Sequence, residues 1–165
     1  MRARRMGWLL LILAAPACGS SGGGEPFTPT TPVADICGML ALSSVQTLVP
    51  GASAGATFTV NGNANLWARG CQWDDRISLM IEGALTSQGV QVLSSEIQVT
   101  SNANRQVTPV AGLGDEAVYL VNVGLDEILN ARKGSYVVSL AAYDSSPPVS
   151  ETALQPLVVE VLGKL

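Results

Sequence analysis

The sequence predicts a single α+β domain, in which a mostly antiparallel sheet carries a short N-terminal helix and a C-terminal amphipathic helix packed on it. Two patterns predict this class: several short runs alternate apolar and polar residues, as strands do, and the last residues carry an apolar stripe with a helical period. Composition is the third observation. Hydrophobic residues make up 47% of the 165 residues and charged residues only 13%, which suits one folded core rather than a disordered chain.

Residues 1–17 have the three-part layout of an export signal. Three arginines precede an apolar run over residues 6–15, and small residues follow it up to Cys18. As a helix, about ten residues span roughly 15 Å, half the thickness of a bilayer core. Pro16 closes the run, so we do not expect a transmembrane anchor here.

Cys18 is the predicted site of lipid attachment. Ala15-Pro16-Ala17 before it resembles a lipobox, although Ala15 stands where lipoboxes usually carry Leu; an ordinary Ala-x-Ala cleavage site is the alternative. Residues 18–32 favour the lipid, because glycine and serine followed by proline and threonine are typical of a flexible stalk. Such a stalk spans roughly 20 Å and would hold an envelope domain, residues 33–165, clear of a bacterial membrane.

The exported part of the chain is acidic. Removing the three arginines of the signal lowers the basic residues from 9 to 6 against 13 acidic ones, and the formal charge moves from −4 to −7. Nucleic-acid affinity comes largely from lysine and arginine contacts to phosphate. We therefore expect no nucleic-acid partner.

The cysteine count predicts one disulfide. The chain has three cysteines, and acylation of Cys18 leaves Cys37 and Cys71 as a pair in an oxidising compartment. A bridge of this spacing would stabilise the domain by about 4 kcal/mol in the chain-entropy model. The alternative is two buried free thiols.

The first half of the domain predicts a helix and two paired strands. Residues 43–46 read Ser-Ser-Val-Gln, an S-x-x-Q capping box that would start a short helix ending near Pro50-Gly51. Residues 56–60 form a β-type run, and Asn61-Gly62 after it is a strong signal for a tight hairpin turn. A short strand carrying Cys71 follows at residues 70–73.

Of the next two segments, the first has the pattern of a strand, whereas the second fits either a helix or strands. Residues 77–85 alternate apolar and polar side chains, as a half-buried strand does. Residues 87–104 fit two patterns: Val90, Leu93 and Ile97 have helical spacing, whereas Val90 with Val92 and Ile97 with Val99 suit strands. We favour a helix.

The second half predicts an antiparallel meander and a final helix. Residues 117–123 are almost continuously apolar, residues 128–132 suit an intervening strand, and residues 136–142 alternate after a turn at Lys133-Gly134. After two prolines, the chain closes on an apolar stripe that should pack on the sheet, formed by Leu154, Leu157, Val158, Val161, Leu162 and Leu165.

Four short motifs carry a family resemblance. Residues 37–40 (Cys-Gly-Met-Leu) with the capped helix, 71–73 (Cys-Gln-Trp), 110–117 (Val-Ala-Gly-Leu-Gly-Asp-Glu-Ala) and a closing strand at 136–138 followed by a helix occur in this order. Their combination resembles small bacterial envelope lipoproteins, best known from actinobacteria, that share a domain of unknown function. The resemblance spans about residues 33–165. It implies an α+β fold with the same disulfide, and no activity, substrate or catalytic residue.

Several enzyme classes lack their usual side chains. The chain contains no histidine, the commonest general base near neutral pH and a frequent zinc ligand. With Cys37 and Cys71 paired, no thiolate nucleophile remains. Residues 19–23 match G-x-S-x-G, but they lie in the stalk, with no strand before them to build a nucleophile elbow. We predict no catalytic residue, metal or cofactor.

Three adjacent carboxylate pairs are the remaining candidates for chemistry. They are Asp74-Asp75, Asp115-Glu116 and Asp126-Glu127. Neighbouring residues on a strand point to opposite faces, so no pair is a ready-made acid and base. We interpret them as solvated turn residues; weak Ca²⁺ contact and catalysis are the alternatives.

Two features suggest a binding surface, formed by Trp67, Gly112, Gly114 and Asp115. Residues 112–115 read Gly-Leu-Gly-Asp before a strand and predict a turn whose glycines adopt positive φ. That turn could also line a ligand or partner surface. Trp67 and Trp73 flank Cys71, and exposed tryptophans could stack on cell-wall sugars, although core packing is the commoner role.

Together these features predict an exported lipoprotein, lipid-anchored to a bacterial membrane in the cell envelope. We expect it to bind a protein partner or an envelope ligand without catalysis. A carboxylate-dependent envelope hydrolase and an accessory to a membrane signalling system are the alternatives.

Overall fold

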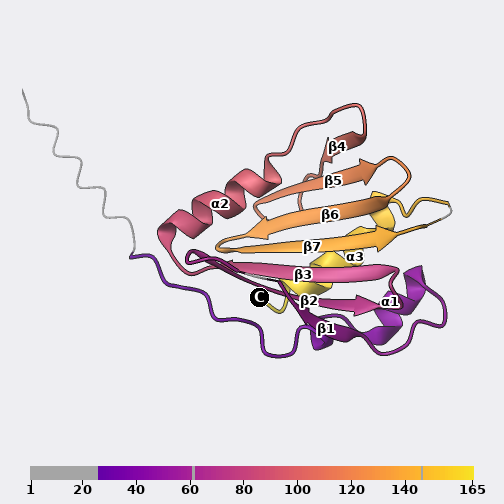
Figure 1. Cartoon of the computed structure of the whole chain (residues 1–165), viewed down its shortest axis with the longest axis horizontal. Helices are drawn as coiled ribbons and strands as arrows, with labels where there is room; N and C mark the ends of the chain where they lie inside the picture. Colours follow the sequence, from indigo (N-terminus) through magenta and orange to yellow (C-terminus); the bar gives the residue numbers. More distant parts are fainter. Residues whose placement is uncertain (1–25, 61, 146) are drawn as a thin grey trace, which may run out of the picture.

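One antiparallel sheet of seven strands organises the residues described by the computed structural model, which are 26–60, 62–145 and 147–165 (Figure 1). Its strand order is β1-β2-β3-β7-β6-β5-β4, and every neighbouring pair is antiparallel. The predicted α+β class is confirmed. The elements are η1 (a 3-10 helix, Cys37–Met39), α1 (Leu42–Leu48), β1 (Ala56–Thr59), β2 (Leu66–Trp73), β3 (Ile77–Ala84), α2 (Ser87–Ile97), β4 (Arg105–Pro109), β5 (Glu116–Asn122), β6 (Asp126–Lys133), β7 (Tyr136–Tyr143) and α3 (Glu151–Leu162).

The C-terminal helix α3 covers one face of the sheet and forms the main core. The predicted stripe is confirmed: Leu154, Leu157, Val158, Val161 and Leu162 are buried, and Leu165 packs against the same cluster. They meet the apolar side chains of the central strands β3, β7 and β6 on that face. Helical spacing in sequence therefore placed this helix correctly, because one continuous stripe must face the sheet.

The helix α2 lies over one end of the opposite face. Its residues Leu93 and Ile97 pack with Ala84, Val118 and Val137 in a second, smaller core. Thr86 caps the helix by accepting a hydrogen bond from the backbone of Gly89 at 3.1 Å. The helical interpretation is thus confirmed for residues 87–97.

The remainder of the predicted helix, residues 98–104, is not helical and leads into the edge strand β4, which was not predicted. The sequence of β4, Arg-Gln-Val-Thr-Pro, has little apolar alternation, and the strand forms by pairing with β5.

The helix α1 begins at Leu42 with Ala41 as its N-cap, so the predicted capping box at residues 43–46 is wrong. A carboxylate from α3 takes this role. Glu160 accepts hydrogen bonds from the backbone N–H of Ala41 at 2.9 Å and from the hydroxyl of Ser44 at 2.8 Å. A distant acceptor satisfies the free end of α1 as a local side chain would.

Strands β1 and β2 form the predicted hairpin, with Thr59 opposite Arg69. The tight turn, however, joins Asn63 to Leu66, which exchange backbone hydrogen bonds of 3.1 and 3.4 Å. The side chain of Asn63 also accepts from Asn65, which favours this position. This described turn differs from the one predicted at Asn61-Gly62, of which Asn61 lies outside the described residues.

The disulfide between Cys37 and Cys71 is present and joins η1 to β2. The two Cα atoms are 5.2 Å apart, within the usual range for a bridge, and Cys71 is fully buried. The predicted pairing is confirmed, and the alternative of two free thiols is wrong.

The export signal (residues 1–17), Cys18 and the first part of the predicted stalk lie outside the described residues. The last part of the predicted stalk, together with Val33, lies along the domain; we call residues 26–33 the arm. Thr30 donates twice to the carbonyl of Ala84, at 2.9 Å from its backbone and 2.8 Å from its hydroxyl, and Arg69 donates to Val33. The flexible stalk predicted over residues 18–32 is thus shorter at its C-terminal end. Within the described ranges, no helix is long and apolar enough to cross a membrane.

Candidate functional site

Trp67 does not offer a surface for ligands. It is only 7% exposed, its indole N–H donates to the hydroxyl of Thr30 at 2.8 Å, and its ring meets Tyr136 edge to face with centroids 6.2 Å apart. Trp73 is 2% exposed. Burial of both rings contradicts the sugar-stacking hypothesis, since stacking needs a free ring face.

The Gly112–Asp115 turn adopts the predicted conformation, with φ of 76° at Gly112 and 64° at Gly114. Its contacts hold the end of β6 and the turn between β6 and β7. Asp115 donates through its backbone to Arg132 at 2.7 Å, and its carboxylate accepts from Gly134 at 2.7 Å and pairs with Arg132 at 3.2 Å. A Cβ at Gly114 would overlap the carbonyl of Arg132. These contacts explain the glycines and the aspartate as a structural clamp.

The four residues of the predicted binding surface therefore fall into two groups. Gly112, Gly114 and Asp115 line one depression of about 450 Å³ beside the end of α3, whereas Trp67 is buried beneath the arm. The depression contains the clamp residues themselves, which leaves them little freedom to rearrange around a ligand.

Each of the three predicted carboxylate pairs has at least one member engaged within the domain. Asp74 accepts from the hydroxyl of Ser53 at 2.6 Å and from its backbone at 3.0 Å, and these bonds lower the pKa of Asp74. Glu116 pairs with Arg132 at 3.4 Å. Glu127 is 6% exposed and accepts from Ser145, which corrects its interpretation as a solvated turn residue.

Asp126, the other member of the pair with Glu127, accepts a hydrogen bond from the side chain of Asn122. For the calcium alternative, the residues with described positions include no group of three or more His, Cys, Asp or Glu side chains suited to a metal ion.

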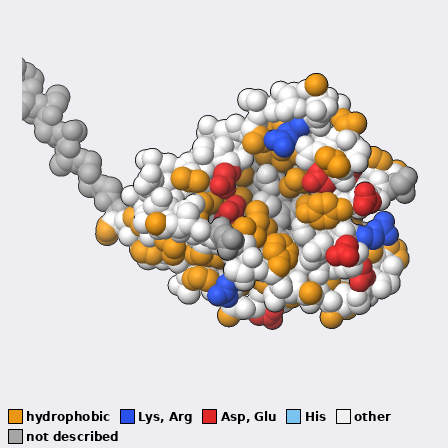
Figure 2. Space-filling model, in the orientation of Figure 1, with side chains coloured by type: hydrophobic (Ala, Val, Ile, Leu, Met, Phe, Trp, Pro, Cys, Tyr) orange, Lys and Arg blue, Asp and Glu red, His pale blue; other side chains and the backbone are white. Residues whose placement is uncertain are grey.

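The face of the sheet that α2 only partly covers, here called the open face, gathers a different set of groups. Strand alternation places Ser78, Met80 and Glu82 of β3 on it, beside Ser139 and Tyr143 of β7 and Ile128 and Asn130 of β6. Figure 2 views this face and shows hydrophobic side chains across it, with acidic groups near α2. Beyond the end of α2 this part of the sheet has no helix over it among the described elements (Figure 1).

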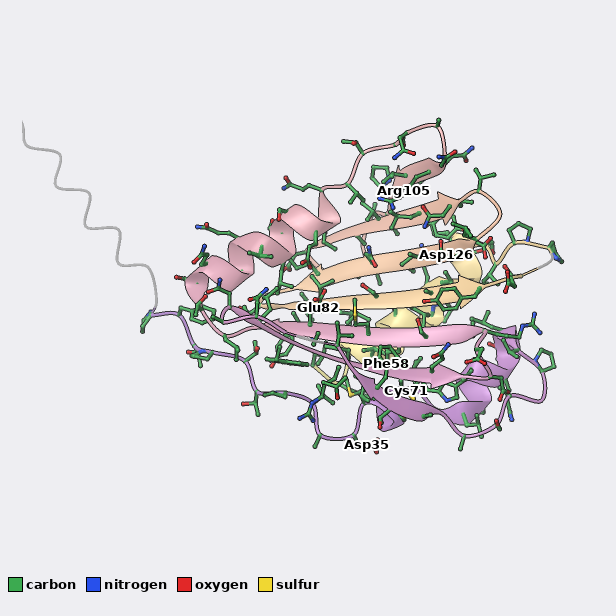
Figure 3. All side chains as sticks on the ribbon, in the orientation of Figure 1. Asp35, Phe58, Cys71, Glu82, Arg105 and Asp126 are labelled. Atoms are coloured by element: carbon green, nitrogen blue, oxygen red, sulfur yellow. A yellow bond between two sulfur atoms is a disulfide. The ribbon has the colours of Figure 1, made fainter. Side chains whose placement is uncertain are left out.

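Glu82 is the most perturbed titratable group on the open face (Figure 3). Burial beneath α2 is the largest cause of its raised pKa, followed by repulsion from the nearby carboxylate of Glu96 on α2 and a hydrogen bond with it. Together these effects raise the pKa of Glu82 from 4.5 to about 7. Below neutral pH the two carboxyl groups can therefore share a proton, which converts a repulsive pair into a hydrogen-bonded one.

Polar groups accompany this pair on the open face. Ser78 and Tyr143 share a hydrogen bond of 2.9 Å between their hydroxyls. The side-chain oxygen of Asn130 is buried and has no hydrogen-bond partner among the described residues. A buried acceptor without a donor costs free energy, which a ligand that donates a hydrogen bond would recover.

A cavity of about 530 Å³ lies on the same side, where the end of α2 meets β4 and β5. Its lining is mainly apolar and includes Ile97, Val99, Val107 and Val118, and Val118 lies opposite Asn130 in the strand register. This volume suits a small-molecule site. The open face thus combines an apolar cavity with a protonatable carboxyl pair.

Sequence reasoning missed this site for a specific reason. Glu82 occupies the polar position of an alternating strand, which normally faces water, and only the position of α2 buries it. A glutamate inside an otherwise apolar and small stretch, Met80 to Ala84, was the one available signal.

Comparisons with known proteins return no match: no protein-family model, no curated protein and no solved structure matches the chain.

Proposed function

We propose that this protein is an exported lipoprotein, tethered to a membrane by a lipid on Cys18, whose domain binds an envelope ligand or a protein partner without catalysis. The observation that carries the proposal is the open face, where α2 leaves much of the sheet uncovered. An apolar cavity of about 530 Å³, the Asn130 oxygen that no described residue hydrogen-bonds and the Glu82–Glu96 pair lie on that side.

Two further observations support an exported, tethered domain. The disulfide between Cys37 and Cys71 suits an oxidising compartment. The arm holds the start of the domain against the end of β3 through Thr30, so residues 19–25, between Cys18 and the arm, would act as the tether.

Intact-mass analysis of the native membrane fraction tests the tether. We expect a mature protein that begins at Cys18 and carries added acyl mass, and a Cys18→Ser variant that leaves the membrane fraction. A mature protein in the membrane fraction without acyl mass would overturn this part of the proposal.

Thermal unfolding of the full-length protein with defined probes tests the open face. The probes are peptidoglycan fragments, a medium-chain fatty acid and a polyamine. We expect one class to raise the melting temperature, and Ser139→Arg on the open face to abolish that rise. The matched control Val159→Arg should keep it, because Val159 is 56% exposed and lies on α3, which covers the opposite face of the sheet. Equal loss in both variants, or no shift with any probe, would count against a ligand site here.

One observation favours a hydrolase as the second candidate. A carboxyl group with a pKa near 7, such as that of Glu82, suits a general acid at physiological pH, and Glu96 is a neighbouring carboxylate. Hydrolysis that is lost in Glu82→Gln but retained in Asp115→Asn would favour this class. Binding of a protein partner, instead of hydrolysis, would favour an accessory role in membrane signalling.

A further inference from the structure

The end of the sheet opposite the arm brings three loops together. The arm bonds to Ala84 at the end of β3, beside the start of β7, and β7 runs from there to Tyr143 at the far end. There Tyr143 donates its backbone N–H to Arg76 at 2.8 Å, and Asp144 donates to Leu125 at 3.3 Å. These bonds join the β2–β3 turn, the β5–β6 turn and the segment after β7 into one surface, here called the distal end (right in Figure 1).

Two aliphatic side chains project from the distal end. Val123 is 65% exposed and Leu125 is 70% exposed, more than any other large hydrophobic residue that the structure describes. The turn that carries them is held in place: Leu125 donates to Asn122 at 3.0 Å, Val123 donates to Asn104 at 3.1 Å, and Gly124 between them supplies a φ of 75°. A rigid turn loses little conformational entropy when a partner covers its side chains.

Polar and acidic groups surround these side chains. Arg105 donates to Asn122 at 2.9 Å, and Asn122 donates to Asp126, which forms an ordered polar rim on one side (Figure 3). The distal end carries Asp74, Asp75, Asp126 and Asp144 against two arginines, Arg76 and Arg105. Figure 2 shows acidic side chains gathered over this end of the molecule.

We propose that the distal end is a docking surface for a protein partner, and that the partner presents an apolar pocket ringed by basic residues. An apolar centre with a polar rim is the common anatomy of protein interfaces. The net negative charge favours a basic protein partner over two other occupants. An anionic membrane surface would be repelled, and in a two-fold contact a second copy of this chain would present the same negative charge. The inference rests on the proposed tether only for the orientation of the distal end, because the arm, at the other end of the sheet, would turn the distal end away from the membrane.

Site-specific photocrosslinking in the native cell tests the proposal. A photoreactive residue replaces Val123 in one full-length protein and Val159, the matched exposed valine on α3, in another. We expect a discrete protein adduct from position 123 and none from position 159.

A supporting adduct must also depend on the chemistry of the surface. Leu125→Asp should lower its yield by about tenfold or more, as removal of a central anchor does. Asp126→Asn combined with Asp144→Asn should lower the adduct yield more at low salt than at high salt, because salt screens the charges. The melting temperature should stay unchanged with Leu125→Asp, because that side chain is largely exposed.

Three outcomes would overturn the inference: equal adducts from positions 123 and 159, an adduct with the mass of two copies of this chain, or an adduct with lipid alone. Cys18→Ser distinguishes the two proposals. If that variant stays in the membrane fraction, the tether is wrong while the adduct at position 123 still tests the distal end.

Discussion

Glu82→Gln should stabilise the domain at alkaline pH and leave its stability unchanged at acidic pH. The cause is the carboxyl pair: burial and the neighbouring Glu96 raise the pKa of Glu82 from 4.5 to about 7. Between about pH 4.5 and pH 7, Glu82 therefore keeps its proton in the folded state, whereas in the unfolded chain it has already released it. The free energy of unfolding therefore falls as the pH rises from about 4.5 to about 7, and it stays at the lower value above that range.

The magnitude follows from the same two values. A pKa raised from 4.5 to about 7 corresponds to at most about 3 kcal/mol, at about 1.36 kcal/mol per pH unit. Glu82 is only partly buried, and screening by solvent lowers this to about 2 kcal/mol. Glutamine cannot ionise, and its amide can still donate to Glu96, so the variant should regain about 2 kcal/mol at pH 8, or roughly 6 °C in melting temperature.

Urea unfolding of the oxidised full-length protein at pH 4.5, 6 and 8 measures the effect. Glu116→Gln is the control of opposite sign, because Glu116 pairs with Arg132 at 3.4 Å and its loss should cost up to about 1 kcal/mol at pH 8. A Glu82→Gln variant that is equally stabilised at all three pH values, or destabilised at pH 8, would refute the reasoning.

Three other substitutions or measurements follow from the contacts. Glu160→Ala should lower the free energy of unfolding by about 1–2 kcal/mol in urea titrations, because the start of α1 loses the carboxylate that accepts from Ala41 and Ser44; wild-type stability would contradict this role. Gly114→Ala should cost more than Gly124→Ala, although both have positive φ, because only at Gly114 does a Cβ meet the backbone of Arg132; equal losses in melting temperature would contradict the clamp. Thiol titration of the denatured, unreduced domain should find no free thiol at Cys37 or Cys71, and reduction should cost about 4 kcal/mol; two titratable thiols would exclude the bridge.

Local patterns predicted most of the architecture. The stripe of α3 and the meander of β5, β6 and β7 are confirmed, because amphipathic periods of helices and strands are local properties that a one-sided core enforces. The strand β4 escaped prediction because an exposed edge strand needs no apolar alternation. The cap of α1 escaped because its acceptor, Glu160, is 116 residues away from Ser44 in sequence.

The candidate site depended far more on tertiary structure. The Gly112–Asp115 turn has the predicted backbone, but its partner Arg132 explains it as a clamp rather than a ligand surface. Trp67 was ambiguous in sequence, and its contacts with Thr30 and Tyr136 decided in favour of the core.

By itself, the sequence determined the fold class, the pairing of Cys37 with Cys71 and the expectation of a tethered, exported protein. Each follows from periodicity, residue counts or a short local pattern, which do not depend on where distant segments meet. Only the tertiary structure decided which polar groups leave water. It placed α2 over Glu82 and held the β5–β6 turn in place so that Leu125 remains exposed, because burial and pKa depend on neighbours that are remote in sequence.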